Sequence, residues 1–174
     1  LLGRRRGDLL TTVIADVEAI QDLVVRVLIP FVASALVIVI TGLSMGGHGA
    51  MWNAIRHKDM FGASGSTSGG MDIRPFPKNW DMAKQLGEYE SNKEVWDNHT
   101  VINQIDKIEN GDLAIIVDCG EDDFFLNVNK DLHNRLLERK IDHDFITRPG
   151  AHNGQYWNNS IDHQILFFDK FFKK

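Results

Sequence analysis

Hydrophobic and polar positions follow two alternating patterns along this chain. Short apolar runs predict strands, and they occupy residues 36–40, 61–66, 113–118 and 143–147. Helices are predicted where apolar residues recur every three or four positions, and these segments are 16–31, 47–57, 127–140 and 156–172. Strands that alternate with helices usually form a parallel sheet, because each crossover returns the chain to the same end of the sheet. The pattern therefore predicts an α/β domain, with a mostly parallel sheet and helices on both faces.

The segment Gly42-Leu43-Ser44-Met45-Gly46 joins the first of these strands to the helix that follows. A strand, Gly-x-Ser-x-Gly and a helix in this order are typical of a nucleophile elbow. In such a turn the serine has strained backbone angles and a projecting hydroxyl, and the glycines leave room for the chain to reverse. The free N–H groups and the positive dipole end of the helix face the point where an oxyanion would form. Ser44 is therefore the candidate nucleophile, and the alternative is an ordinary strand-to-helix turn.

A serine nucleophile needs a base, and the base needs an orienting acid. The acid candidates are Asp118 at the end of one strand, and Asp122 and Asp123 in the loop after it. Asp123 is favoured, because the acid of such sites usually comes from the loop rather than from the strand. The alternative is that this acidic loop is a solvated turn that caps the next helix.

His152 is the candidate base. Of the seven histidines, it alone lies in a glycine-rich loop that follows a strand downstream of the acid. This agrees with the chain order Ser, acid, His of hydrolases with such an elbow. The acid and the histidine follow strands that end at the same edge as Ser44, where open α/β sheets bind ligands. Helix positions, packing or polar loops explain the other histidines, which are His48, His57, His99, His133, His143 and His163.

Three motifs in this order resemble the esterase D / S-formylglutathione hydrolase family, whose relatives include tributyrin-type, acetylxylan and feruloyl esterases. Residues 42–50, GLSMGGHGA, are similar to the family's elbow. Residues 118–125, DCGEDDFF, are similar to its acid loop, whose pattern places the acid at Asp123. Residues 149–152, PGAH, followed by Tyr156-Trp157, are similar to its histidine loop. With residues 66–80, which resemble the bacterial esterase branch, the resemblance extends from residue 41 to the end.

This resemblance implies an α/β-hydrolase fold and the chemistry of a serine carboxylesterase. Ser44, Asp123 and His152 would form a triad that hydrolyses short-chain acyl esters or thioesters through an acyl-enzyme, with no cofactor and no metal. Two alternatives stay open: an acyltransferase with the same triad, and a non-catalytic, truncated hydrolase fragment.

The same fold predicts further roles at the site. The backbone N–H of Met45 would be one oxyanion donor, and Trp80 and Trp157 are predicted to contact substrate. The second donor would come from an early loop, which is not recognisable in residues 1–40. We therefore expect a single α/β-hydrolase domain over residues 1–174 that is N-terminally truncated, with an atypical segment before the elbow.

Residues 71–110 interrupt the alternation of strands and helices with aromatic residues among charged ones. Such an excursion above the nucleophile is typical of a lid or a wall of the acyl pocket. The alternative is a helical cap whose aromatic residues form a small core of their own.

Composition and charge limit the classes of partner that this chain is expected to bind. With 19 Lys and Arg against 24 Asp and Glu, the net charge of −5 offers no electrostatic footprint for nucleic acid. The apolar run 27–40 is too short to span a membrane and contains Pro30. Cys119, the single cysteine, is interpreted as a small core residue rather than a thiol nucleophile. The expected partner is a small acyl ester or thioester, and an unpaired edge on strand 36–40 predicts a homo-oligomer.

Overall fold

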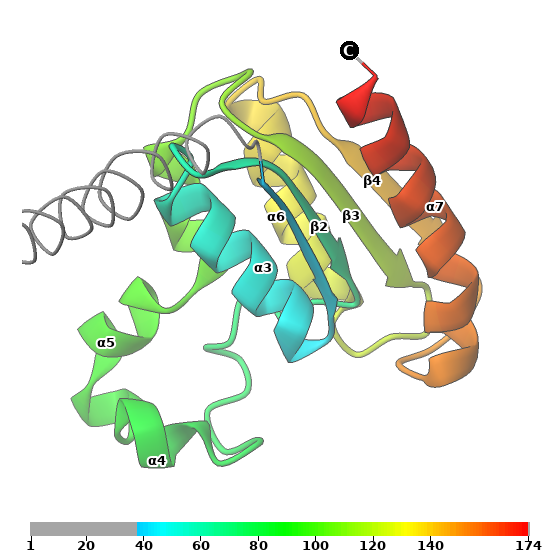
Figure 1. Ribbon diagram of the computed structural model, residues 1–174. Helices are drawn as coiled ribbons and strands as arrows, with labels where there is room; N and C mark the ends of the chain where they lie inside the picture. The colour runs from blue at the N-terminus through cyan, green and yellow to red at the C-terminus, as the bar shows by residue number, and fades with distance from the viewer. Residues whose placement is uncertain (1–37, 174) are drawn as a thin grey trace, which may run out of the picture. The chain divides into compact units, whose positions relative to one another are not determined.

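The computed structural model describes residues 38–173, which contain a sheet of four strands (Figure 1). The strands are β1 (Ile38–Leu43), β2 (Phe61–Thr67), β3 (Ala114–Gly120) and β4 (Asp144–Arg148). They lie in the order β1-β2-β3-β4, and every neighbouring pair is parallel. The predicted parallel α/β architecture is confirmed. The helix predicted over residues 16–31 lies outside the described residues, as does most of the segment predicted to be atypical.

The first strand extends further toward Ser44 than its apolar run indicated. Thr41, Gly42 and Leu43 continue the pairing with β2, opposite Gly65, Ser66 and Thr67 respectively. Thr41 and Gly42 interrupt the apolar run, so hydropathy alone stopped the predicted strand at residue 40. Pairing with β2 satisfies their backbone groups and brings β1 to the residue before the elbow serine.

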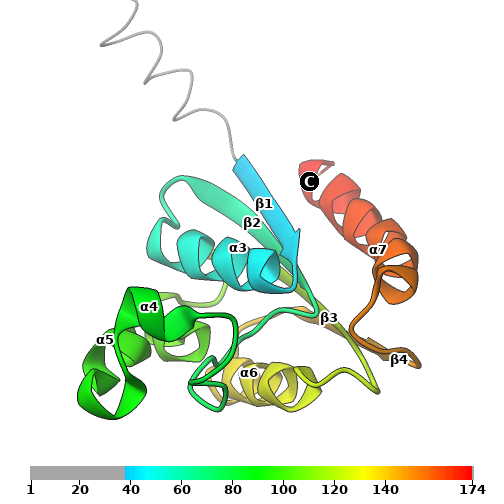
Figure 2. The same ribbon diagram turned by 90° about the horizontal axis from the view of Figure 1, so that it is seen from below.

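Helices cover both faces of the sheet, as predicted. Figure 2 shows α3 (Met45–Arg56) and α6 (Leu126–Glu138) on one face and α7 (Gly154–Phe172) on the other. Close approach depends on the small residues of β2, because a Cβ on Gly65 would lie 2.0 Å from Gln164 Oε1 of α7. On the other face, a Cβ on Gly47 of α3 would lie 2.4 Å from Ser66 Oγ.

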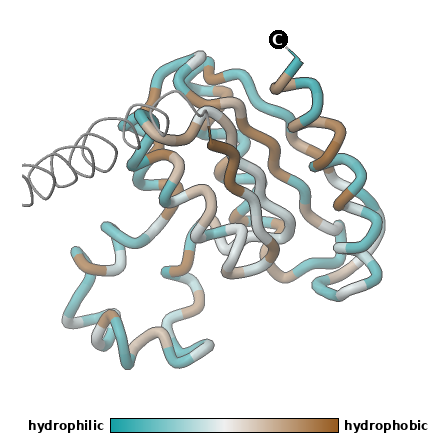
Figure 3. The backbone as a smooth tube through the Cα atoms, viewed as in Figure 1, coloured by the Kyte–Doolittle hydropathy of each residue, from teal (hydrophilic) through white to brown (hydrophobic). Residues whose placement is uncertain are grey.

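The main hydrophobic core lies between the sheet and the layer formed by α3 and α6. Its fully buried side chains include Met51, Ile55, Ile115, Phe125 and Leu132. Burial of each such side chain stabilises the fold by about 1.5–3 kcal/mol. In Figure 3 strongly hydrophobic stretches follow β1 and β3. The central strands β2 and β3 are largely buried, whereas β1 and β4 are partly exposed.

Residues 71–110 form a largely helical segment between β2 and β3. Its elements are α4 (Met82–Leu86), η2 (Tyr89–Ser91), α5 (Lys93–Asn98) and η3 (Val101–Lys107). Ile73, Met82 and Trp96 are buried together in a second, smaller core. Val101 and Ile105 of η3 belong instead to the main core, and so anchor the segment to the sheet domain.

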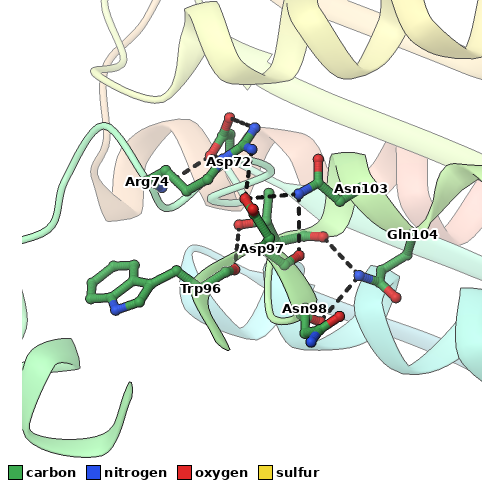
Figure 4. Close-up of polar contacts among 8 residues, drawn as sticks. Asp72, Arg74, Trp96, Asp97, Asn98, Asn103 and Gln104 are labelled. Carbon is green, nitrogen blue, oxygen red and sulfur yellow. Dashed lines mark hydrogen bonds and ion pairs between the residues drawn. The ribbon is translucent and has the colours of Figure 1, made fainter. Parts of the chain in front are cut away.

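An ion-pair network joins the start of this segment to α5 and η3 (Figure 4). Arg74 donates to both oxygens of the Asp72 carboxylate, from Nε at 2.9 Å and from Nη2 at 2.6 Å. Its Nη1 donates to Asp97 Oδ1 at 2.8 Å, and Asn103 Nδ2 donates to the same oxygen at 3.2 Å. Hydrogen bonds to Asp72, then to Asp97, raise the pKa of Arg74, so its guanidinium stays charged at any working pH. The network fixes the course of the chain just before Phe76.

Within the described residues, 38–173 form one compact unit. Because the preceding residues are not described, a single domain over the whole chain stays a prediction. Within the described range, no helix is both long enough and apolar enough to cross a membrane.

Candidate active site

Ser44 occupies the sharp turn between β1 and α3, with φ 54° and ψ −126°. A positive φ is rare for a residue with a side chain and costs about 1–3 kcal/mol, and such strain is concentrated at functional sites. The turn needs glycine before it, because a Cβ on Gly42 would lie 2.5 Å from the carbonyl carbon of Gly46. The N–H of Ser44 donates to Thr67 O at 2.9 Å, which fixes the turn against β2. The serine side chain is thereby held at the carboxyl edge of the sheet.

His152 lies in the loop between β4 and α7, with its Nε2 2.8 Å from Ser44 Oγ. Its Nδ1 is 2.9 Å and 3.0 Å from the two carboxylate oxygens of Asp123. A carboxylate can only accept, so Nδ1 carries the proton and Nε2 is free to accept from the serine hydroxyl. The imidazole is therefore in the tautomer that a general base requires.

Asp123 is 5% exposed, and its orientation is fixed by a second contact. Its Oδ1 also accepts from the backbone N–H of Phe125 at 2.8 Å. The structure thus places the favoured acid, base and nucleophile in one continuous line of hydrogen bonds.

The two rival acids have different surroundings. Asp118 is fully buried and accepts from Tyr156, Ser160 and Arg148 rather than from His152. Asp122 is exposed, and its backbone N–H donates to Gly150 O at 2.9 Å. Neither side chain contributes a hydrogen bond to the imidazole.

Met45 is the first residue of α3. The N–H groups of the first helical turn have no intrahelical acceptor, so that of Met45 is available next to Ser44. Together with the positive end of the helix dipole, it provides an environment that stabilises negative charge.

Aromatic side chains flank the imidazole on two sides. The ring centroid of Phe124 lies 4.3 Å from that of His152, and Trp80 stacks on Phe124 at 5.9 Å. Trp80 and Phe124 are 49% and 50% exposed, so this stacked pair is open to solvent. Trp157 meets the imidazole edge-on at 5.1 Å, and its Nε1 is buried without a partner among the described residues. Trp157 thus touches the histidine directly, whereas Trp80 reaches it through Phe124.

Phe124 was not singled out from the sequence. The available signal was a pair of phenylalanines directly after the candidate acid, in a loop that is otherwise polar. Phe125 is buried in the main core and meets the imidazole edge-on at 5.5 Å, whereas Phe124 is half exposed and lies closer, at 4.3 Å. The local sequence does not distinguish these two orientations.

Two other groups near the site are unsuited to act as nucleophile or base. Cys119 is fully buried, and burial raises the pKa of its thiol well above the usual range. Burial lowers the pKa of His48, whose Nδ1 is hydrogen bonded to Gly70 O at 2.7 Å. Among residues 38–173, no group of three or more histidine, cysteine or acidic side chains is placed to hold a metal ion.

The sequence profile of a family described as "Putative esterase" matches residues 20–168. The chain belongs to this esterase family. The membership predicted from the three motifs is therefore confirmed.

Similar proteins agree with this assignment. An acetyl esterase from Caldicellulosiruptor saccharolyticus is 28% identical over 143 residues, which are 75% of this chain and 54% of that protein. Among solved structures, a ferulic acid esterase has 26% identity and a TM-score of 0.61, covering 85% of this chain and 59% of its own. The S-formylglutathione hydrolase FrmB from Staphylococcus aureus has 24% identity and a TM-score of 0.55, covering 74% and 49%. The α/β-hydrolase fold is thus confirmed, and the chain spans about half the length of these relatives.

Proposed function

We propose that this protein is a serine carboxylesterase with Ser44 as nucleophile, His152 as general base and Asp123 as the orienting acid. The observation that carries the proposal is the line of hydrogen bonds from Ser44 Oγ through the imidazole to the buried carboxylate. Membership of the esterase family supports the same chemistry.

The reaction follows from the positions of these groups. Ser44 Oγ attacks the ester carbonyl carbon while its proton passes to Nε2 of His152. The Met45 N–H stabilises the negative oxygen of the tetrahedral intermediate, and Asp123 stabilises the imidazolium. The proton then passes to the departing alcohol or thiol, leaving an acyl group on Ser44. Water attacks this acyl-enzyme with His152 again as base, and the acid product and free serine are released.

The proposed substrates are short-chain acyl esters or thioesters. Trp80 and Phe124 offer an open aromatic surface beside the imidazole, and Trp157 lies against its other side. We assign Phe76 and Trp80 to the wall of the substrate pocket, because Phe76 packs on both Phe124 and Trp80. Phe76 also packs on the small core of Ile73, Met82 and Trp96, which would support this wall from behind.

Hydrolysis of p-nitrophenyl acetate and butyrate by the purified chain tests the proposal. We expect turnover that Ser44→Ala abolishes, and covalent labelling of Ser44 by a fluorophosphonate probe. Ser91→Ala, at an exposed serine of η2, is the matched control and should retain both properties. Labelling that persists in Ser44→Ala, or an inactive wild-type chain, would contradict the proposed function. Product analysis with an added alcohol distinguishes hydrolysis from acyl transfer.

A further inference from the structure

A second buried carboxylate lies behind the histidine loop and is not used by the proposed triad. Asp118 is 0% exposed, near the end of β3. Its Oδ1 accepts from the hydroxyl of Tyr156, and from Ser160 Oγ at 3.0 Å. Its Oδ2 accepts from Arg148 Nη2 at 2.8 Å. Three donors therefore converge on a group that could not be buried as an anion without them.

These donors bracket His152 in the chain. Arg148 is the last residue of β4, and Tyr156 and Ser160 lie in the first turns of α7. The loop between them carries the imidazole. Arg148 Nη2 also donates to Ser160 Oγ at 2.8 Å, and its guanidinium lies 5.1 Å from the Tyr156 ring centroid. Asp118 thus ties the two ends of the histidine loop to each other and to the strand that leads to the acid loop.

Backbone contacts connect the two loops directly. The N–H of Glu121 donates to Arg148 O at 2.9 Å, and the N–H of Asp122 donates to Gly150 O at 2.9 Å. Gly150 has φ 143°, and a Cβ at this position would lie 2.5 Å from the Tyr156 ring. The ring of Tyr156 therefore fits against the bare backbone of the histidine loop, and its hydroxyl donates to Asp118.

Burial, followed by the hydrogen bond to Asp118, raises the pKa of Tyr156 well above its usual value. The phenol consequently stays protonated and remains a donor throughout the pH range in which esterases are assayed.

We propose that Asp118 and Tyr156 are positioning residues that hold the histidine loop in register with the acid loop, so that His152 meets Ser44 and Asp123 together. This inference rests on the proposed function for its kinetic consequence. Neither residue hydrogen bonds to the imidazole, so each acts through the loop. A misplacement of about 1 Å in such an array can cost about 10²-fold in rate, because proton transfer requires short, aligned contacts.

Tyr156→Phe tests the proposal, because it removes one hydroxyl and leaves the ring that packs on Gly150. We expect kcat for p-nitrophenyl acetate, per titrated active site, to fall about tenfold while KM changes less than twofold. Tyr89→Phe, at the chain's other tyrosine, should leave both constants unchanged. Ser160→Ala should lower kcat in the same way, and Ser160→Thr, which keeps a hydroxyl, should restore it.

Amide hydrogen exchange gives a readout that does not depend on activity. In Tyr156→Phe, exchange should accelerate in residues 149–153 and not in α3. An unchanged kcat per active site together with uniformly faster exchange would mean a purely structural role and would overturn the proposal. If the wild-type chain has no esterase activity, the proposed function fails. Faster exchange confined to residues 149–153 in Tyr156→Phe would still support the positioning role, and uniformly faster exchange would refute it.

Discussion

Replacing Asp123 by asparagine should prevent His152 from acting as a base without disturbing the fold. The contacts of the two carboxylate oxygens explain why. Oδ1 accepts from the Phe125 N–H at 2.8 Å, so the amide oxygen of an asparagine must occupy this position. The amide nitrogen then replaces Oδ2, which lies 2.9 Å from Nδ1 of His152. Two N–H donors would face each other, and the imidazole avoids this by moving its proton to Nε2. That nitrogen then faces Ser44 as a donor and cannot accept the hydroxyl proton.

The wrong tautomer in a triad of this type lowers turnover by about 10⁴-fold. Each factor of ten corresponds to about 1.4 kcal/mol of activation free energy, so we expect a loss of about 5.5 kcal/mol in Asp123→Asn. KM should change little, because the carboxylate does not face the substrate. The side chains are isosteric, so the thermal midpoint should change by only a few degrees.

The assay is steady-state hydrolysis of p-nitrophenyl acetate, with active sites titrated by a fluorophosphonate. Asp122→Asn is the matched control, because it removes the same charge from the neighbouring, exposed position. We expect this control to keep at least half of the wild-type turnover. A loss of less than tenfold in Asp123→Asn, or a greater loss in Asp122→Asn, would refute the tautomer argument and the assignment of the acid.

Three other predictions concern stability and association. Gly65→Ala should lower the unfolding free energy by about 1–3 kcal/mol in urea titrations, because its Cβ would lie 2.0 Å from Gln164 Oε1; Gly49→Ala, with no atom within 4 Å of the added Cβ, should not. Burial, and then the neighbouring His143, lower the pKa of His133, so the folded state favours its neutral form. Its stabilising contribution is therefore present above the unfolded pKa of about 6.5 and is lost as the pH falls below it. The urea midpoint should accordingly decrease less between pH 7 and pH 5 in His133→Gln than in the wild type, and equal decreases would contradict this. Ile165 of α7 is 59% exposed and, within residues 38–173, no strand pairs with the outer edge of β1. We therefore expect the molar mass of the protein from light scattering to rise with concentration, and Ile165→Lys to reduce this rise. A monomer at every concentration would argue against association.

The strands, the helices and the elbow could be predicted because their signals are local. An apolar run before Gly42, and glycines on both sides of Ser44, constrain the backbone over a few residues whatever the rest of the chain does. The periodicity of residues 127–140 similarly indicated one buried face, and α6 buries Val128, Leu132 and Leu136 there. At the end of β1 hydropathy stopped the predicted strand too early, because backbone pairing with β2 continues the strand through Thr41 and Gly42.

Which aspartate meets the histidine was decided by the tertiary structure. Asp118, Asp122 and Asp123 lie within six residues, and their chemistry is the same. Asp118 instead accepts hydrogen bonds from Arg148, Tyr156 and Ser160. These donors lie at least 30 positions further along the chain.

The same reason applies to the aromatic side chains around the imidazole. Phe124 and Phe125 differ only in direction, and that direction follows from which face of the loop packs on the core. Residues 71–110 had no periodicity to guide a prediction, because the side chains of their small core come from short elements and loops rather than from one long helix. Local sequence thus determined the elements and the elbow, whereas contacts between distant segments decided which side chains surround His152.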